Sequence, residues 1–411
     1  MKIRQSVFWR IFIVIALVAL VVLGISPLIK ATRVFSDSAY ATELLGVDFV
    51  DAENGWAVGD AGVIYHTSDG GQSWNLQDWQ YSDDMFCMLN GVNFIDQNNG
   101  WVVGHIPVGQ TEQAVIIHTS NGGASWQVQS TFTEYQEFSA VQFLDSNNGW
   151  VTVSYPNNQT ILHSTNGGIT WSIALSGGGG NNLFDIDFVD PNNGMAVGGK
   201  IWHTSDGGTH WNLQNDPVFD VDILYGLEFI TPNDAWALGN MGHILHTSDG
   251  GNNWQVQYQV PDHTPVQATD FIGINNGWIV GGHILHTTNG GTTWEQQNDP
   301  ADYLRDVQFN DANKGWAVGG IMVGGHGMAT ILHTTDGGQH WNLQLSPFIT
   351  HSTITTTSTG TTNAVTGITV GGEVNPVNKF AVLAPWLALI AIIILGGAML
   401  MSRNKNSKIE K

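Results

Sequence analysis

Apolar residues in the middle of the chain recur in short alternating runs, as in Val47–Val50 and Val307–Phe309. A period of two indicates strands with one buried face. No stretch between the two ends of the chain shows the period expected of a long amphipathic helix. Glycine, at 50 residues, and tryptophan, at 17, are both abundant. The pattern predicts an all-β protein with many tight turns.

The alternating runs belong to a repeat that occurs seven times. Each copy ends in a tryptophan, and successive copies of this residue lie 40 to 52 residues apart. The closing tryptophans are Trp74, Trp126, Trp171, Trp211, Trp254, Trp294 and Trp341. A period of this length with several short strands predicts a β-propeller.

Each repeat predicts four strands. The Val-x-Phe run is the first, and an Asp-x-Asn-Asn-Gly turn follows it, as in Asp96–Gly100. We interpret Asn-Gly here as a hairpin turn in which both residues adopt positive φ. A Trp-Ala-Val-Gly strand, an Ile-Leu-His-Thr strand, an Asp-Gly-Gly turn and a fourth strand complete the unit. Seven such sheets around an axis would bury each other's faces, so residues 42–345 are expected to form a seven-bladed propeller.

The N-terminal residues 1–41 contain an uncharged apolar run at residues 11–29, preceded by Lys2, Arg4 and Arg10. This run is long enough to span a bilayer. Ala39–Ala41 has the small-x-small form of a signal-peptidase site. The segment is therefore interpreted as either a cleaved signal peptide or a membrane anchor.

A second apolar run covers residues 380–401 and predicts a transmembrane helix. The basic tail at residues 402–411 is expected on the cytoplasmic side, as is the basic N-terminus. Residues 346–379 contain a threonine-rich core and predict a flexible stalk. These features predict a cell-membrane protein with one or two passes and an extracytoplasmic propeller. No LPxTG-type sorting signal precedes the second run.

Charge narrows the possible partners. The net charge of the chain is −22, and residues 42–345 carry 32 Asp and Glu against Lys200, Arg305 and Lys314. Nucleic acid and anionic lipid would be repelled, because they are bound through Lys and Arg. Cations or a basic partner surface are the natural complements.

The candidate chemistry favours binding over catalysis. A single cysteine, Cys87, excludes an intrachain disulfide, and no basic neighbour in sequence would activate its thiol. A sialidase needs an arginine triad for the substrate carboxylate, whereas Arg305 is the one arginine of residues 42–345. Hydrolysis of a neutral glycan by paired carboxylates stays open as an alternative. We expect no catalytic residue, no cofactor and no metal.

One histidine recurs before the closing turn of each repeat. These residues are His66, His118, His163, His203, His246, His286 and His333. A metal would need several of them within about 2 Å of one ion, so a repeated polar strand position is the preferred interpretation. All fifteen histidines lie between His66 and His351. Acidification between about pH 5 and 7 would therefore reduce the negative charge and alter partner affinity or solubility.

The turn between the third and fourth strands matches the Asp-box (BNR repeat) pattern Ser/Thr-x-Asp/Asn-x-Gly-x-x-Trp. The matching residues are Thr67, Asp69, Gly71, Trp74; Thr119, Asn121, Gly123, Trp126; Ser164, Asn166, Gly168, Trp171; Thr204, Asp206, Gly208, Trp211; Thr247, Asp249, Gly251, Trp254; Thr287, Asn289, Gly291, Trp294; and Thr334, Asp336, Gly338, Trp341. We expect a structural role for all seven boxes: the Asp or Asn accepts turn N–H groups, the glycine takes positive φ and the tryptophan packs between blades.

Taken whole, the unit most resembles the photosystem II assembly and stability factor family of chloroplasts and cyanobacteria, from Leu44 to Gln344. The resemblance implies a seven-bladed propeller on the lumenal side of the thylakoid that binds photosystem II subunits during assembly. That family uses an arginine-rich patch toward its partner and lacks a C-terminal anchor. This chain differs in both respects.

These observations together predict a non-catalytic, membrane-anchored propeller that binds a protein partner. It would aid the assembly or stability of a membrane complex. The alternative is a surface propeller that binds or cleaves carbohydrate. Insertions at His105–Glu112 and Ile321–Met328 are candidate contact loops.

Overall fold

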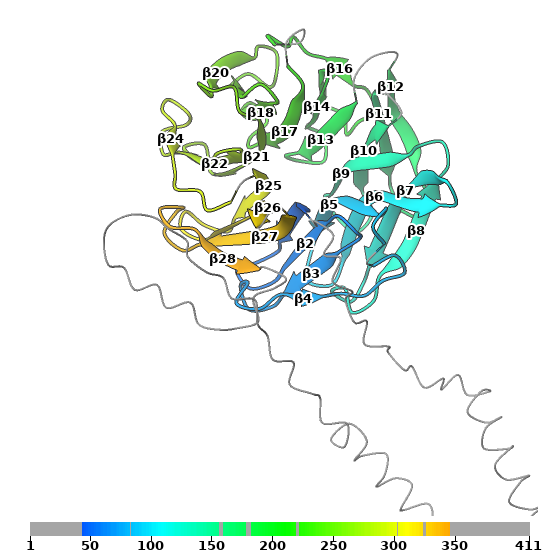
Figure 1. Ribbon diagram of the computed structural model, residues 1–411. Helices are drawn as coiled ribbons and strands as arrows, with labels where there is room; N and C mark the ends of the chain where they lie inside the picture. The colour runs from blue at the N-terminus through cyan, green and yellow to red at the C-terminus, as the bar shows by residue number, and fades with distance from the viewer. Residues whose placement is uncertain are drawn as a thin grey trace, which may run out of the picture. The chain divides into compact units, whose positions relative to one another are not determined.

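The computed structural model describes residues 43–345 except 83, 156–158, 178–181, 219–221, 302 and 324–325. These residues form seven four-stranded antiparallel sheets arranged around one axis (Figure 1). The predicted seven-bladed β-propeller is confirmed. Within the described part of the chain, no helix is long and apolar enough to span a bilayer. The expected membrane segments and stalk lie outside the described residues.

Each blade consists of four consecutive strands. Blade 1 comprises β1 (Leu44–Phe49), β2 (Gly55–Gly59), β3 (Ile64–Thr67) and β4 (Asn75–Leu76). Blade 2 comprises β5 (Met88–Phe94), β6 (Gly100–Val108), β7 (Thr111–Thr119) and β8 (Gln127–Phe132). Blade 3 comprises β9 (Glu137–Phe143), β10 (Gly149–Tyr155), β11 (Gln159–Ser164) and β12 (Ser172–Gly177).

The remaining blades follow the same order. Blade 4 comprises β13 (Leu183–Phe188), β14 (Gly194–Gly198), β15 (Ile201–Thr204) and β16 (Asn212–Leu213). Blade 5 comprises β17 (Leu224–Phe229), β18 (Ala235–Gly239), β19 (His243–Thr247) and β20 (Gln255–Gln259). Blade 6 comprises β21 (Val266–Ile272), β22 (Asn276–Gly281), β23 (Leu285–Thr287) and β24 (Glu295–Gln296), and blade 7 comprises β25 (Tyr303–Phe309), β26 (Gly315–Val323), β27 (His326–Thr334) and β28 (Asn342–Leu345).

The first strand of every blade is the innermost and contacts the first strands of both neighbouring blades around the axis. Blade 7 lies against blade 1, because β25 contacts β1. The alternating strand directions define two faces. The mouth face carries the starts of the inner strands and the hairpins between second and third strands. The box face carries the Asp boxes and the turns that follow the inner strands.

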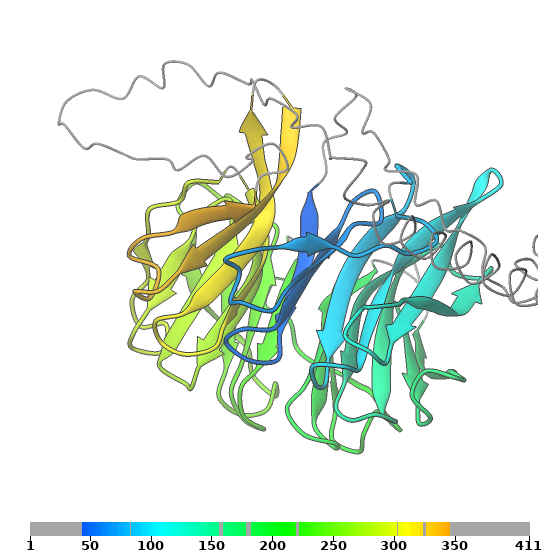
Figure 2. The same ribbon diagram turned by 90° about the horizontal axis from the view of Figure 1, so that it is seen from below.

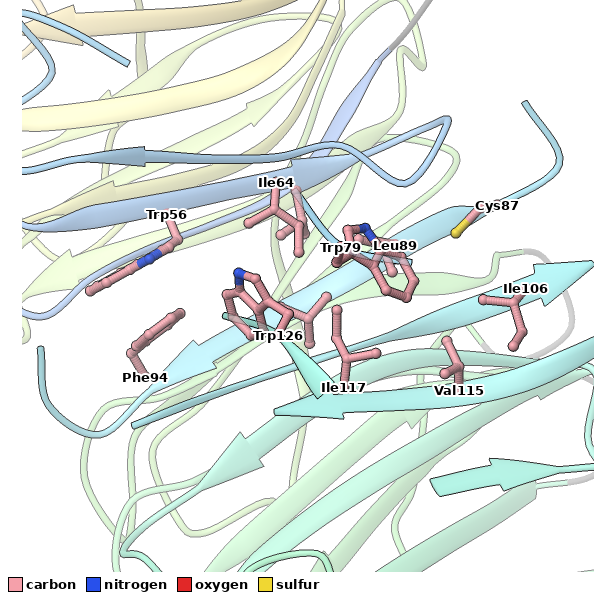
Figure 3. Close-up of a cluster of buried hydrophobic side chains, with 12 residues drawn as sticks. Trp56, Ile64, Trp79, Cys87, Leu89, Phe94, Ile106, Val115, Ile117 and Trp126 are labelled. Carbon is pink, nitrogen blue, oxygen red and sulfur yellow. The ribbon is translucent and has the colours of Figure 1, made fainter. Parts of the chain in front are cut away.

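Aromatic stacking fills the interfaces between blades. Trp56 of β2 stacks on Phe94 of β5 in the next blade, with ring centroids 3.5 Å apart, and the closing Trp126 meets the edge of Phe94 (Figure 3). Blade 4 departs from the pattern, because Met195 replaces the tryptophan of the second strand. Large fully buried rings such as Trp56 contribute much of the buried apolar area that stabilises the fold.

The Asn-Gly turn joins β1 and β2 in the predicted hairpin, but the expected positive φ at both residues is wrong. Gly55 does not adopt positive φ, and a Cβ atom there would collide with the ring of Phe49. The turn itself is formed by Asp51, whose Oδ1 accepts the N–H groups of Glu53 and Asn54. The ring of Phe49 lies between Gly55 and Trp316. A glycine is therefore required at position 55, because a side chain there would displace this ring.

Side chains of the inner strands close the ring by hydrogen bonding between blades. In every blade the polar residue that precedes the terminal Phe of the inner strand accepts the backbone N–H of the equivalent Phe in the next blade, at 2.5–2.9 Å. The acceptors are Asp48, Asn93, Gln142, Asp187, Glu228, Asp270 and Gln308. Each bond contributes roughly 0.5–1.5 kcal/mol net, and together the seven set the spacing of the blades.

The two predicted insertions form long hairpins on the mouth face. Register pairs Met88 with His105 and Tyr303 with Gly320, so the ends of β6–β7 and β26–β27 extend beyond the starts of the inner strands. Figure 2 shows both hairpins, in cyan and gold-yellow, rising on the same side of the propeller. In blade 2 the segment consists of two regular strands joined by a short turn at residues 109–110.

We expect Gly149→Ala to destabilise the propeller by about 1–3 kcal/mol. The new methyl group would meet the ring of Phe143, which is held on its other side by Trp101 at 3.7 Å between centroids. Gly177→Ala in the same blade is the control, since its nearest neighbour would be Cζ2 of Trp202 at 3.6 Å. Urea unfolding of both variants checks this, and equal midpoints would contradict the packing role.

Candidate functional site at the mouth of the central channel

Seven equivalent positions at the start of the inner strands line a central cavity. When the repeats are aligned on the terminal Phe of each inner strand, the residue four places before it differs in every blade. All seven line a cavity of about 450 Å³ and are called the variable ring below: Leu45, Asn90, Ser139, Phe184, Tyr225, Gln267 and Arg305. The position just before each of them is apolar and buried in every blade, because it packs between sheets.

Two kinds of contact fix the side chains of this ring. Phe184 and Tyr225 form an edge-to-face pair with centroids 4.9 Å apart, which places an aromatic wall at blades 4 and 5. Arg305 makes two charge-assisted bonds to the Glu43 carboxylate, from Nε and one terminal nitrogen, both at 2.9 Å. The guanidinium also lies 4.7 Å from the ring centre of Tyr303. Arg305 is therefore neutralised by a fixed partner.

Polar residues between blades 2 and 3 are ordered by local bonds. Asn90 donates to Oε1 of Glu137 at 2.8 Å and to the carbonyl of Phe138 at 2.7 Å. Ser139 donates to the carbonyl of Leu183 at 2.9 Å. These side chains are held before any partner arrives, which reduces the entropy lost on binding.

Below the mouth, six carboxyl groups face one another across the channel. They are Asp48, Asp185, Asp187, Glu228, Asp270 and Asp306. Each accepts a backbone N–H from the next blade. Because all six are bonded to the wall, their placement is explained by the propeller itself.

Loss of water around these carboxyls raises their pKa values. Burial raises the pKa of Asp48, Asp270 and Asp306 to about 7 each, and mutual repulsion adds to this for Asp48 and Asp270. Burial also places the pKa of Asp185 and of Glu228 well above the usual range. Burial therefore disfavours the ionised form of these carboxyls, and the channel becomes negatively charged only near neutral pH.

The residues predicted as Asp-box positions lie at the opposite face of the propeller. In blade 1, Thr67 accepts the N–H of Gly71 at 2.8 Å and donates to Asp69, whose Oδ1 accepts the N–H of Ser73 at 2.9 Å. Gly71 adopts φ of 83°, and Trp74 meets the edge of Phe49. The boxes are distributed one per blade, so they are not brought together in one site.

The recurring histidines also stay separate, one in each blade. Six of them pack against the second-strand tryptophan of their own blade, as His163 stacks on Trp150 with centroids 4.6 Å apart. Partial burial lowers the pKa of all seven. They therefore gain charge at a lower pH than free histidine does. Among the described residues, no group of three His, Cys, Asp or Glu could hold a metal.

Cys87 lies within the apolar cluster between blades 1 and 2, where Figure 3 shows its sulfur. The residue is 1% exposed, and burial raises the pKa of its thiol to about 12. The thiol is therefore kept in its unreactive protonated form.

Sequence reasoning missed both the variable ring and the six channel carboxyls. A signal for the ring was present, because the residue four places before the Phe of the inner strand differs in all seven repeats, whereas the residue before it is always apolar. The carboxyls were counted in the net charge, but their convergence depends on contacts between residues 39 to 259 positions apart.

Comparison with known proteins gives one family. The family model of the photosynthesis system II assembly factor YCF48 matches residues 35–131, 93–178, 174–256 and 217–301. A comparison with curated protein sequences finds no match.

Solved structures share the fold. YCF48 bound to D1 peptide has a TM-score of 0.55 at 19% identity, over 72% of this chain and 94% of that one. YCF48 from Cyanidioschyzon merolae has a TM-score of 0.53 at 18% identity, over 68% and 94%. A GH74 enzyme from Niastella koreensis has 0.54 at 12% identity, over 74% and 66%. At these identities the likeness shows the propeller fold alone.

The raised carboxyl pKa values predict that the propeller loses stability as pH rises through 7. The folded state holds protons on Asp48, Asp270 and Asp306 up to about pH 7, whereas unfolded Asp loses them near pH 4. The stability that these protons contribute is thus complete below the pKa of the unfolded state, and it is lost as the pH rises through the pKa of the folded state. The lowered pKa of the histidines removes stability below about pH 6.5.

We expect Asp270→Asn to stabilise the fold by on the order of 1–3 kcal/mol at pH 8 and by less toward pH 4. The amide keeps the acceptor for Phe309, as Asn93 does for Phe143 in blade 2. Asp145→Asn on the exposed box face is the control. Denaturant unfolding across this pH range measures the effect, and a gain independent of pH would refute it.

Proposed function

The chain belongs to the family of the photosynthesis system II assembly factor YCF48, and from this premise we propose that it is a non-catalytic propeller that binds a protein partner at its mouth face. Such binding would aid the assembly or stability of a membrane complex. A solved YCF48 carries a D1 peptide, which supports a peptide or protein segment as the class of ligand.

The observation that carries the proposal is the break in repeat symmetry at the channel mouth. Seven blades share one packing pattern, yet the ring from Leu45 to Arg305 presents seven different side chains to one cavity. Packing does not require this variety, since the position faces open space. A surface that reads a specific partner requires chemically distinct contacts of this kind.

Exposed apolar side chains on the mouth face support a protein partner. Met85 and Phe86 lie in the connection to blade 2 and are 50% and 62% exposed, and Met241 in the β18–β19 turn is 42% exposed. Val108 and Met322 lie near the tips of the two long hairpins and are also exposed. Apolar residues around a polar cavity are typical of interfaces between proteins.

The carboxyls of the channel favour binding over hydrolysis. Each of the six is held by a backbone N–H of the neighbouring blade, which accounts for its position without a substrate. A retaining or inverting glycosidase needs one carboxyl free to donate a proton and a second free to attack or activate water. The glycan alternative has no comparable support.

We also propose that the propeller lies on the extracytoplasmic side of a membrane. The apolar runs at residues 11–29 and 380–401, each flanked by basic residues, support this placement. Protease treatment of intact spheroplasts should remove the propeller and spare the basic tail. A propeller that is digested only after lysis would contradict the proposed topology.

The partner should be captured through the mouth face. We expect the paired changes Phe86→Ser and Met241→Ser to lower the yield of a crosslinked partner complex at least about threefold, because truncating exposed apolar anchors weakens binding. The matched control is Ile169→Ser with Ile274→Ser, two exposed apolar residues on the box face.

The measurement is in-cell crosslinking of the tagged full-length chain, followed by affinity capture and quantification. Surface changes of this kind leave folding nearly unaffected, so the two variants differ chiefly in the face they alter. Equal yields from both variants, or a larger loss from the box-face pair, would rule out the mouth face as the binding surface.

A further inference from the structure

Carboxyl groups outnumber cationic side chains around the mouth cavity. Asp185, Asp306 and Glu137 contribute carboxyl groups to its lining, whereas Arg305 is the one cationic side chain that the described residues place there. Both nitrogens of Arg305 that face Glu43 are committed to that carboxylate. The cavity therefore presents to an incoming cation several carboxyl groups that can become ionised and no free cationic group among the described residues.

Several hydrogen-bond acceptors at the cavity have no partner in the protein. Ser154 is 5% exposed, lines the cavity, and its Oγ has no hydrogen-bond partner. Oδ1 of Asn182, also in the lining, and Oε2 of Glu228 below it are likewise buried without a partner. A buried polar atom without a partner costs roughly 1–3 kcal/mol, and a ligand that donates hydrogen bonds would remove this cost.

The cavity also has an apolar surface, which is the aromatic wall. Phe184 and Tyr225 both line the cavity and stand edge to face. Aromatic rings pack against the methylene stem of a long basic side chain and attract its charged head. A neutral or acidic side chain of the same length would gain only the packing.

From these contacts we propose that the mouth cavity binds the side chain of a lysine or arginine in an exposed segment of the protein partner. The inference rests on the proposed function and names the chemistry that the site recognises. The basic head would donate to Ser154, Asn182 and the carboxyls of Asp185 and Asp306, while its stem lies on the aromatic wall.

Electrostatics favour this occupant. Burial raises the pKa of Asp185, and repulsion from Asp187 and Asp306 raises it further, so a positive charge in the cavity would favour the ionised form of this carboxyl. A bare metal ion fits less well, because no three carboxyl or histidine groups of the described chain converge at ligand distance. The net charge of −22 would also attract a basic segment from a distance.

The test uses the full-length protein in mild detergent and a synthetic heptapeptide in which two lysines flank a phenylalanine. Matched peptides carry norleucine or glutamate in place of both lysines. Isothermal titration calorimetry should give a Kd below about 1 mM for the lysine peptide, with at least tenfold weaker binding of the other two. Raising the salt concentration should weaken the binding of the lysine peptide.

The protein variant is Asp185→Asn with Asp306→Asn. Asparagine keeps the acceptors for Leu227 and Val47 and removes the two carboxyl groups that a bound cation would hold in their ionised form, and it should not unfold the blades. Binding of the lysine peptide should weaken at least tenfold. The control, Glu53→Gln with Glu295→Gln, removes two exposed charges outside the channel and should change the Kd less than twofold.

The outcomes separate the two proposals. No measurable binding of the lysine peptide, or equal binding of the norleucine or glutamate peptide, overturns the basic-side-chain inference. If the Kd of the lysine peptide is unchanged in the variant with Asp185→Asn and Asp306→Asn, the basic side chain does not bind in the mouth cavity. A partner captured in cells through the mouth face alongside any of these results leaves the proposed function standing.

Discussion

The hydrogen bond from the backbone of one blade to a side chain of the preceding blade is the constraint on which the rest of the structure depends. In all seven interfaces the N–H of the inner-strand Phe binds a carboxyl or amide oxygen, including the closing contact between Phe49 and Gln308. Each bond requires a polar side chain at one fixed position. The alternation of the strand places the neighbouring Phe between sheets, where it stacks on the tryptophan or methionine of the second strand.

Because the acceptors lie at the axis of the propeller, their side chains determine which polar groups line the channel. Four of the seven are carboxyls, namely Asp48, Asp187, Glu228 and Asp270, and two more, Asp185 and Asp306, bind backbone N–H groups one level closer to the mouth. Amides at Asn93, Gln142 and Gln308 perform the same closing role without charge. The excess of carboxyls is thus not needed for closure. It places ionisable groups next to the mouth, where the variable ring and the aromatic wall lie.

Much of the fold could be read from the sequence, and the site could not. Seven closing tryptophans at regular intervals define the number of blades, because each repeat is one unit that must be covered by its neighbours. The role of the glycine in the Asn-Gly turn was misjudged, since contact with the ring of Phe49, and not a positive φ, requires Gly55. The six channel carboxyls come from five blades, and the closing contacts from blade 7 to blade 1 join residues 259 positions apart. Only the variable ring could have been found by aligning the repeats.

Amide hydrogen exchange of the captured complex tests most directly whether the channel mouth is the binding surface. Bound partner should slow exchange at the starts of the inner strands, at residues 43–46, 88–91, 182–185 and 303–306. The Asp-box turns, such as residues 67–74, should exchange at the same rate with and without partner. Protection confined to the Asp-box turns or the outer strands would contradict the account, because it would place the partner on the opposite face or the rim of the propeller.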